Sequence, residues 1–165
     1  MMKSARPDNK FLFAHPAHFL AFGFGAGLMP RAPGTWGTLV ALPIFAFAQM
    51  GGTFSVLVVA AIFFVVGIWA SGVAGRALGV ADHGGIVIDE IAAFLLVLAL
   101  TPAAIGWWLT AFVLFRIFDI FKPWPIRWAD RNIKGGFGVM FDDLLAAVFA
   151  IAGIFLLRVL SNAVF

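Results

Sequence analysis

The sequence predicts an all-α fold: a polytopic membrane bundle of about five helices, made of two helical hairpins and a C-terminal helix. Three observations predict this class. Of the 165 residues, 63% are hydrophobic and 12% are charged, whereas soluble domains carry about 25% charged residues. The apolar residues form long runs, and the basic residues gather in the connections at one side. These features argue against a soluble globular fold and exclude a disordered chain.

Residues 1–36 are expected to form an N-terminal segment, followed by the bundle over 37–165, in a single domain. The charged start resembles that of a signal peptide, but His15, Pro16, His18 and several glycines break the apolar run behind it. A secretory signal has an uninterrupted apolar core. We therefore expect an interfacial helix that leads into a glycine-rich loop.

The first hairpin is predicted over 37–50 and 53–75, with the adjacent glycines 51 and 52 as its turn. Its first arm is shorter than the roughly 20 residues that span a bilayer, so partial insertion is one outcome. The second arm carries small residues four positions apart, Gly67, Ser71 and Gly75. Such a face allows close helix packing.

The second hairpin is predicted over 86–100 and 102–121. It is interrupted before Pro102, because proline disfavours helix in the residue that precedes it. Further prolines and a basic loop over 122–136 follow, and a last apolar helix is predicted over 139–160.

This topology places ten basic residues on one side of the membrane and leaves Arg158 alone on the other. The ten are Lys3, Arg6, Lys10, Arg31, Arg76, Arg116, Lys122, Arg127, Arg131 and Lys134. Basic loops face the cytoplasm in most membrane proteins. We therefore expect the N-terminus and both polar loops to be cytoplasmic.

Four acidic residues lie inside apolar runs, as two adjacent pairs near helix starts: Asp89 and Glu90, and Asp142 and Asp143. A charge within a bilayer costs several kcal/mol, which favours a functional role. Two such pairs on facing helices supply oxygen ligands for Mg²⁺ or Mn²⁺. The alternative is structural: these carboxylates pair with Arg116 and Lys122 or reach water at the helix ends.

Arg116, Asp119 and Lys122 share one helix face. An Arg–Asp pair can be purely structural, but beside a metal site the guanidinium and ammonium groups indicate a phosphate clamp. In the glycine-rich loop, Arg31, Thr35 and Thr38 are further phosphate contacts if the backbone cradles an anion. His83 is more typical of a hydrogen-bonded loop histidine than of a ligand.

The composition excludes several chemistries. There is no Cys and no Tyr, which excludes disulfides, thiolate metal sites, and cysteine or tyrosine nucleophiles. The net charge of +3 on so apolar a chain fits an anionic lipid surface or anionic substrate better than nucleic acid.

Four sequence blocks resemble the bacterial phosphatidylglycerophosphatase A family: HPAHFLAFGFGAGLMPRAPGTWGTL, GVADHGGIVIDE, FRIFDIFKPWPIRWADRN and KGGFGVMFDD. The resemblance implies a Mg²⁺-dependent enzyme of the bacterial cytoplasmic membrane, with its site on the cytoplasmic side. Such an enzyme hydrolyses the terminal phosphate of phosphatidylglycerophosphate to give phosphatidylglycerol in phospholipid biosynthesis. Two family glycines are replaced here by Ala93 and Ala147.

The resemblance makes both acidic pairs the metal candidates and adds Asp119 to them as a catalytic candidate. Secondary candidates are Asp82, His83 and Asp130. Arg116 and Lys122 are the principal phosphate-binding candidates. Which carboxylate acts as base, and whether water or an aspartate attacks phosphorus, stays open.

Two other classes of function remain at this point. One is a phosphatase for another membrane lipid phosphate, such as a polyprenyl phosphate. The other is non-enzymatic: an ion-coupled small transporter, whose charges should lie near the membrane midplane, or a scaffold. The oligomeric state is open.

Overall fold

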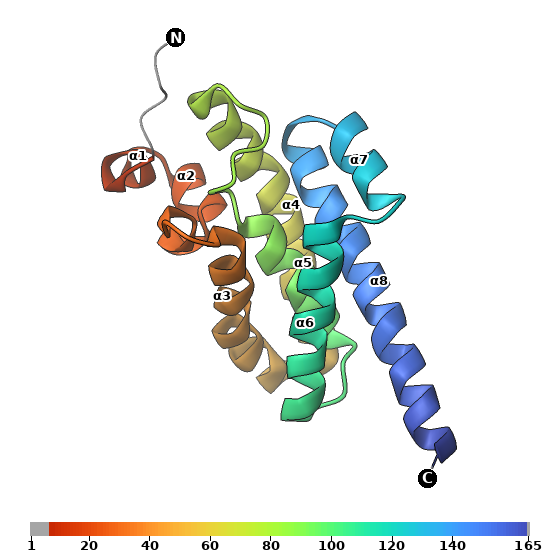
Figure 1. Cartoon of the computed structure of the whole chain (residues 1–165). Helices are drawn as coiled ribbons and strands as arrows, with labels where there is room; N and C mark the ends of the chain where they lie inside the picture. Colours follow the sequence, from red (N-terminus) through yellow and green to blue (C-terminus); the bar gives the residue numbers. More distant parts are fainter. Residues whose placement is uncertain (1–6, 165) are drawn as a thin grey trace.

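The computed structural model describes residues 7–164, and every regular element in that range is helical (Figure 1). The elements are α1 (Asn9–Ala14), α2 (Pro16–Ala21), η1 (Gly23–Leu28), α3 (Pro33–Ala48), η2 (Gln49–Gly51), α4 (Gly52–Leu78), α5 (Ile88–Ala99), α6 (Ile105–Phe121), α7 (Ile126–Asn132) and α8 (Gly135–Val164). The all-α prediction is confirmed over this range.

Both predicted hairpin turns are confirmed at the glycine and proline residues from which they were predicted. Gly52 adopts a positive φ of 79° between α3 and α4, a conformation that glycine adopts without strain. Helices α5 and α6 are separated around Pro102. Several boundaries were predicted wrongly: α3 begins at Pro33 instead of 37, α6 at Ile105 instead of 102, and α8 at Gly135 instead of 139. The basic connection also contains a helix, α7.

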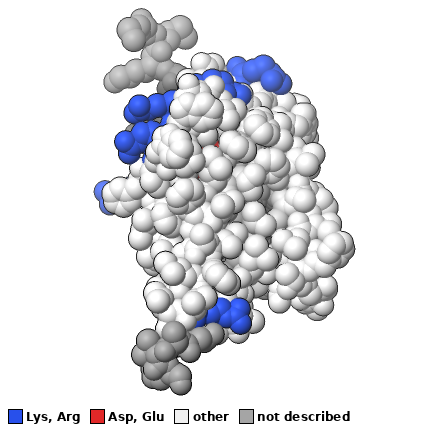
Figure 2. Space-filling view, turned by 90° about the vertical axis from the view of Figure 1, so that its right-hand side faces the viewer, with Lys and Arg blue, Asp and Glu red and all other residues white. Residues whose placement is uncertain are grey.

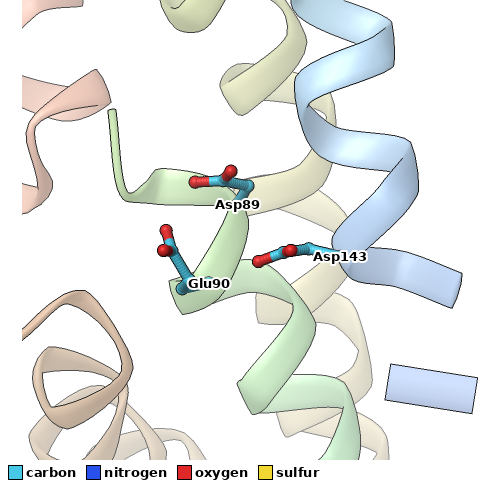
Figure 3. A group of neighbouring side chains, drawn as sticks. All are labelled: Asp89, Glu90 and Asp143. Carbon is cyan, nitrogen blue, oxygen red and sulfur yellow. The ribbon is translucent and has the colours of Figure 1, made fainter. Parts of the chain in front are cut away.

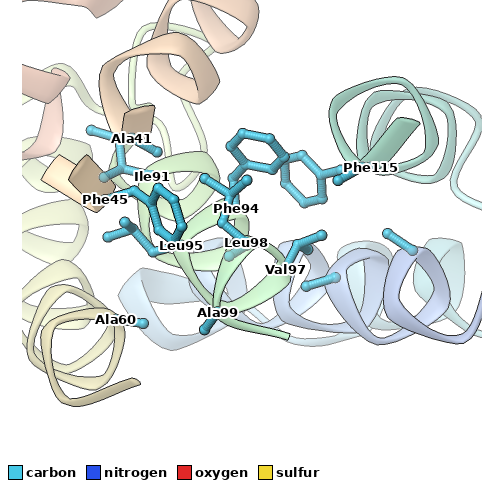
Figure 4. Close-up of a cluster of buried hydrophobic side chains, with 14 of the residues drawn as sticks. Ala41, Phe45, Ala60, Ile91, Phe94, Leu95, Val97, Leu98, Ala99 and Phe115 are labelled. Atoms are coloured by element: carbon cyan, nitrogen blue, oxygen red, sulfur yellow. The ribbon is translucent and has the colours of Figure 1, made fainter. Parts of the chain in front are cut away.

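Helix α5 lies at the centre of the bundle and packs against α3, α4, α6 and α8. Almost its entire surface is buried, and Phe94 and Leu95 are fully enclosed. Figure 4 shows this core, in which Phe45 of α3 and Phe115 of α6 pack around α5. The acidic residues at the start of α5 therefore lie on a helix that contacts all four of the other long helices.

Two described stretches are long and apolar enough to cross a membrane, Pro33–Leu78 and Gly135–Ser161. The first contains both α3 and α4. The expectation of five separate membrane helices is therefore not confirmed. In particular, the 12 residues of α5 extend only about 18 Å, less than the roughly 30 Å hydrocarbon core of a bilayer.

The exterior of the bundle is unusually apolar, and several charged side chains lie inside it. Large apolar side chains are exposed, with Phe47 at 77% and Phe54 at 78%, whereas five of the acidic residues are buried. On the face drawn in Figure 2, lysine and arginine gather toward the two ends of the molecule, and almost no acidic surface is visible. Such an exterior is suited to an apolar environment.

The N-terminal segment contains the expected helix as two short helices, and part of the expected glycine-rich loop forms a 3₁₀ segment. Helices α1 and α2 and the 3₁₀ segment η1 pack as a unit before α3. A Cβ atom on Gly27 would overlap the carbonyl oxygen of Gly85, so this glycine permits contact between two backbones. Of the basic residues expected here, Lys3 and Arg6 lie outside the described residues.

Two of the three positions on the predicted small-residue face of α4 pack against α8, whereas Gly75 lies against the loop that follows α4. Gly67 lies against Met140 of α8, and the Ser71 hydroxyl lies 4.0 Å from the Met140 sulfur. On the α8 side, a Cβ on Gly136 would overlap the carbonyl oxygen of Ile68.

We therefore expect Gly136→Ala to destabilise the bundle by about 1–3 kcal/mol, because α4 and α8 would have to separate. Thermal unfolding in detergent measures the effect as a lower Tm. Gly106→Ala is the matched control, since a Cβ there meets open space. An unchanged Tm for Gly136→Ala would show that α4 and α8 do not approach this closely.

Candidate active site

Three buried carboxylates meet between α5 and α8. Asp89 and Glu90 lie in the first turn of α5 and are each 9% exposed; Asp143 of α8 is 2% exposed. One oxygen atom from each lies within 4.8 Å of the other two. Figure 3 shows Asp143 reaching from α8 toward the two acidic side chains of α5.

The loop before α5 fixes where the helix begins. The Val87 amide donates to the Ala21 carbonyl at 2.8 Å, which ties the loop to α2. The Gly85 amide donates to Nδ1 of His83 at 3.0 Å, and the His83 ring stacks on Phe22. The structure thus places His83 as a loop-stabilising residue, the alternative that the sequence favoured.

Each carboxylate of this group has an unsatisfied oxygen. Asp89 Oδ1, Glu90 Oε2 and Asp143 Oδ2 are buried without a hydrogen-bond partner in the described structure. Buried polar atoms are normally paired, and neighbouring carboxylates repel when ionised. The donor set fits a hard divalent cation, because such ions prefer oxygen ligands and relieve that repulsion.

Arg116 of α6 borders the carboxylate group. Its Nη1 atom lies 2.6 Å from Asp119 Oδ2 and 3.7 Å from Glu90 Oε1. The same nitrogen donates to the Thr38 hydroxyl at 3.3 Å, and that hydroxyl donates to the Gly34 carbonyl at 2.9 Å. Arg116 is therefore held between α3, α5 and its own helix, with Nε buried and unpaired.

Asp142 does not join the three carboxylates, contrary to the predicted ligand set. It pairs with Lys122, whose ammonium group also donates to Asp130 at 2.8 Å. The reason is helical geometry, because successive residues point about 100° apart. Burial lowers the pKa of Lys122, but Asp142 and Asp130 raise it more, so Lys122 stays protonated.

The remaining predicted residues are more peripheral. Asp82 and Asp130 line a cavity of about 240 Å³ beside Asp142. Arg31 is exposed and Thr35 is half-buried at the start of α3. The two positions that depart from the family pattern, Ala93 and Ala147, are buried in the core that α5 and α8 share.

Gly34 is the site residue that the sequence analysis missed. A Cβ atom on Gly34 would overlap Glu90 Oε1 and lie 3.2 Å from both Nη atoms of Arg116. The available signal was its position four residues before Thr38, which places both on one face of α3. Glycine here lets α3 approach the charged groups.

We expect Gly34→Ala to lower kcat/KM by about 100-fold, because it displaces Glu90 and Arg116. The phosphate-release assay described below measures the loss. Gly106→Ala again serves as control and should leave turnover unchanged, since it adds a methyl group to open space. Full activity of Gly34→Ala would contradict the described contact.

Comparison with known proteins supplies the family. The profile of the family described as "Phosphatidylglycerophosphatase A" matches residues 19–158. A protein of that name from Haemophilus influenzae is 41% identical over 160 residues, covering 95% of this chain and 98% of the relative. Another, from Escherichia coli K12, is 41% identical over 149 residues, covering 88% and 85%.

A third relative, from Bacteroides thetaiotaomicron, is provisionally named a phosphatidylinositol-3-phosphatase. It is 40% identical over 138 residues, covering 78% of this chain and 84% of the relative. No solved structure matches the chain. The matched region contains Asp89, Glu90, Asp143 and Arg116. These matches show that the chain belongs to the phosphatidylglycerophosphatase A family of hydrolytic enzymes.

Proposed function

We propose that this protein hydrolyses the terminal phosphate of phosphatidylglycerophosphate, giving phosphatidylglycerol and inorganic phosphate in bacterial phospholipid biosynthesis. The names of two relatives at 41% identity support the substrate. The observation that carries the proposal is the group of three buried carboxylates beside Arg116. Carboxylates and an arginine fork are the groups that metal-assisted phosphate hydrolysis requires.

Asp89, Glu90 and Asp143 are the residues that would hold Mg²⁺, through oxygens that otherwise have no partner. When bound there, the ion neutralises phosphate charge and lowers the pKa of a water molecule. Asp142 is assigned a different role: with Asp130 it holds the Lys122 ammonium group beside the site.

The chain's own groups then bind the substrate and move the proton. Arg116 donates to the non-bridging oxygens of the phosphate, and Thr38 keeps its guanidinium oriented. Attack by water forms the new bond to phosphorus while the bond to the glycerol oxygen breaks. A carboxylate of the group accepts the water proton, which passes to the leaving glycerol oxygen.

We further propose a multi-pass arrangement in the bacterial inner membrane, with the site at the cytoplasmic face. The exposed apolar side chains of α3, α4, α6 and α8 support contact with lipid. Helix α5 lies inside this bundle and reaches only part of the way across. Trp124 and Trp128 lie exposed beside the basic end and suit the membrane interface.

The test is phosphate release from phosphatidylglycerophosphate by detergent-purified protein, with Mg²⁺ and then with excess chelator. We expect release that falls to background with chelator and returns when Mg²⁺ is restored. Phosphate release that does not change with chelator would refute the metal assignment but would still support the proposed activity. No release from folded protein would refute the activity itself.

A second candidate substrate is another lipid phosphate, because one relative carries the name of a phosphoinositide phosphatase. The same assay with phosphatidylinositol 3-phosphate and a polyprenyl phosphate separates these possibilities. We expect the highest kcat/KM on phosphatidylglycerophosphate, and a higher value on either alternative would reassign the substrate.

A further inference from the structure

A cavity of about 550 Å³ lies between α3 and α6, outside the carboxylate site. Apart from Gln49 its walls are apolar: Leu39, Leu42 and Phe45 come from α3, and Trp108, Leu109 and Phe112 come from α6. Figure 1 shows these two helices on either side of the buried helix α5. The volume is within the range of small-molecule binding sites, about 300–1,000 Å³. We call this cavity the α3–α6 groove.

One end of the α3–α6 groove lies next to the candidate active site. Leu39 directly follows Thr38, whose hydroxyl contacts Arg116. On the facing helix, Phe112 lies one turn from Arg116, and Trp108 lies two turns away, about 12 Å along the axis. A molecule whose phosphate is bound by Arg116 can therefore place an apolar part in the groove.

The groove also opens to the outside of the bundle. Leu39 is 37% exposed and Leu109 is 62% exposed, although both line the cavity. A molecule would therefore enter the groove from the apolar outer surface of the bundle. The ring of Trp108 forms part of the inner wall of the groove, packed edge-on against Phe45.

We propose that the α3–α6 groove binds one acyl chain of the lipid substrate. This inference rests on the proposed function and adds to it a site for the apolar half of the substrate. A diacyl lipid phosphate fits this order of groups, with its phosphate at Arg116 and one chain along Leu42 and Phe45. The groove thereby selects diacyl lipids over water-soluble glycerol phosphates.

The test fills the groove and compares two substrates. Ala46 lines the cavity and carries only a methyl group, so Ala46→Trp occupies space meant for the chain. The substrates are phosphatidylglycerophosphate with long acyl chains and its water-soluble analogue with very short chains. Ala61→Trp, on the exposed side of α4, is the matched control, and Ala46→Leu gives a smaller obstruction.

We expect Ala46→Trp to lower the long-chain to short-chain ratio of kcat/KM by about tenfold, the scale of a blocked apolar subsite. Ala46→Leu should lower it less, and Ala61→Trp should keep the wild-type ratio. An unchanged ratio in both Ala46 variants would overturn the proposal, as would equal losses on both substrates, which indicate a structural lipid or a disturbed bundle. If the wild-type protein hydrolyses neither substrate, the proposed function fails instead.

Discussion

Asp143→Asn is expected to reduce phosphate release by about 10³-fold, the upper range for removal of one electrostatic group in an active site. Asp143 is the member of the carboxylate group that lies on α8, and it is the most buried of the three. The amide keeps the shape of the side chain but removes its charge and one acceptor oxygen. The metal-binding set would be reduced to two carboxylates on α5.

Initial rates of phosphate release at saturating Mg²⁺ measure this effect. Asp8→Asn is the matched control, because Asp8 accepts from the Phe11 amide as the N-cap of α1 and asparagine caps equally well. It should retain wild-type activity. An active Asp143→Asn enzyme would remove this carboxylate from the mechanism.

Arg116→Lys is expected to lower kcat/KM by about 100-fold or more, even though it keeps the positive charge. The Nη1 atom of Arg116 alone contacts Asp119, Glu90 and Thr38, which leaves the other nitrogens of the guanidinium group for the phosphate. Lysine has a single nitrogen, so an ammonium group held by these partners cannot also bind phosphate through two parallel hydrogen bonds.

The comparison enzyme is Arg158→Lys, which makes the same change on an exposed residue near the end of α8. It should behave as wild type in both kcat/KM and Tm. If Arg116→Lys were equally active, the guanidinium would serve packing alone, and phosphate recognition would have to be assigned to Lys122.

The helices and their breaks could be predicted from the sequence because local chemistry determines them. Gly52 and Pro102 lie between apolar runs, and the hairpin positions follow from that. The central position of α5 could not be predicted in this way. It depends on which helices pack against it, and after its first turn the sequence of α5 is as apolar as that of its neighbours.

The same holds for the candidate site: its chemistry could be predicted from the sequence, but its three-dimensional arrangement could not. Buried acids in an apolar chain indicated the chemistry, and Asp89, Glu90 and Asp143 do come together. The sequence could not separate Asp143 from Asp142, because the rotation of α8 decides which of them faces α5. That rotation is set by long-range contacts, including the approach of Gly136 to the backbone of α4.

Cation binding by the two neighbouring aspartate variants tests the central claim most directly. Mn²⁺ titration of detergent-purified protein, followed by electron paramagnetic resonance, reports binding without turnover. The arrangement of Asp89, Glu90 and Asp143 predicts that Asp143→Asn loses Mn²⁺ binding, whereas Asp142→Asn retains it. Loss of binding in Asp142→Asn with retention in Asp143→Asn would contradict the described site.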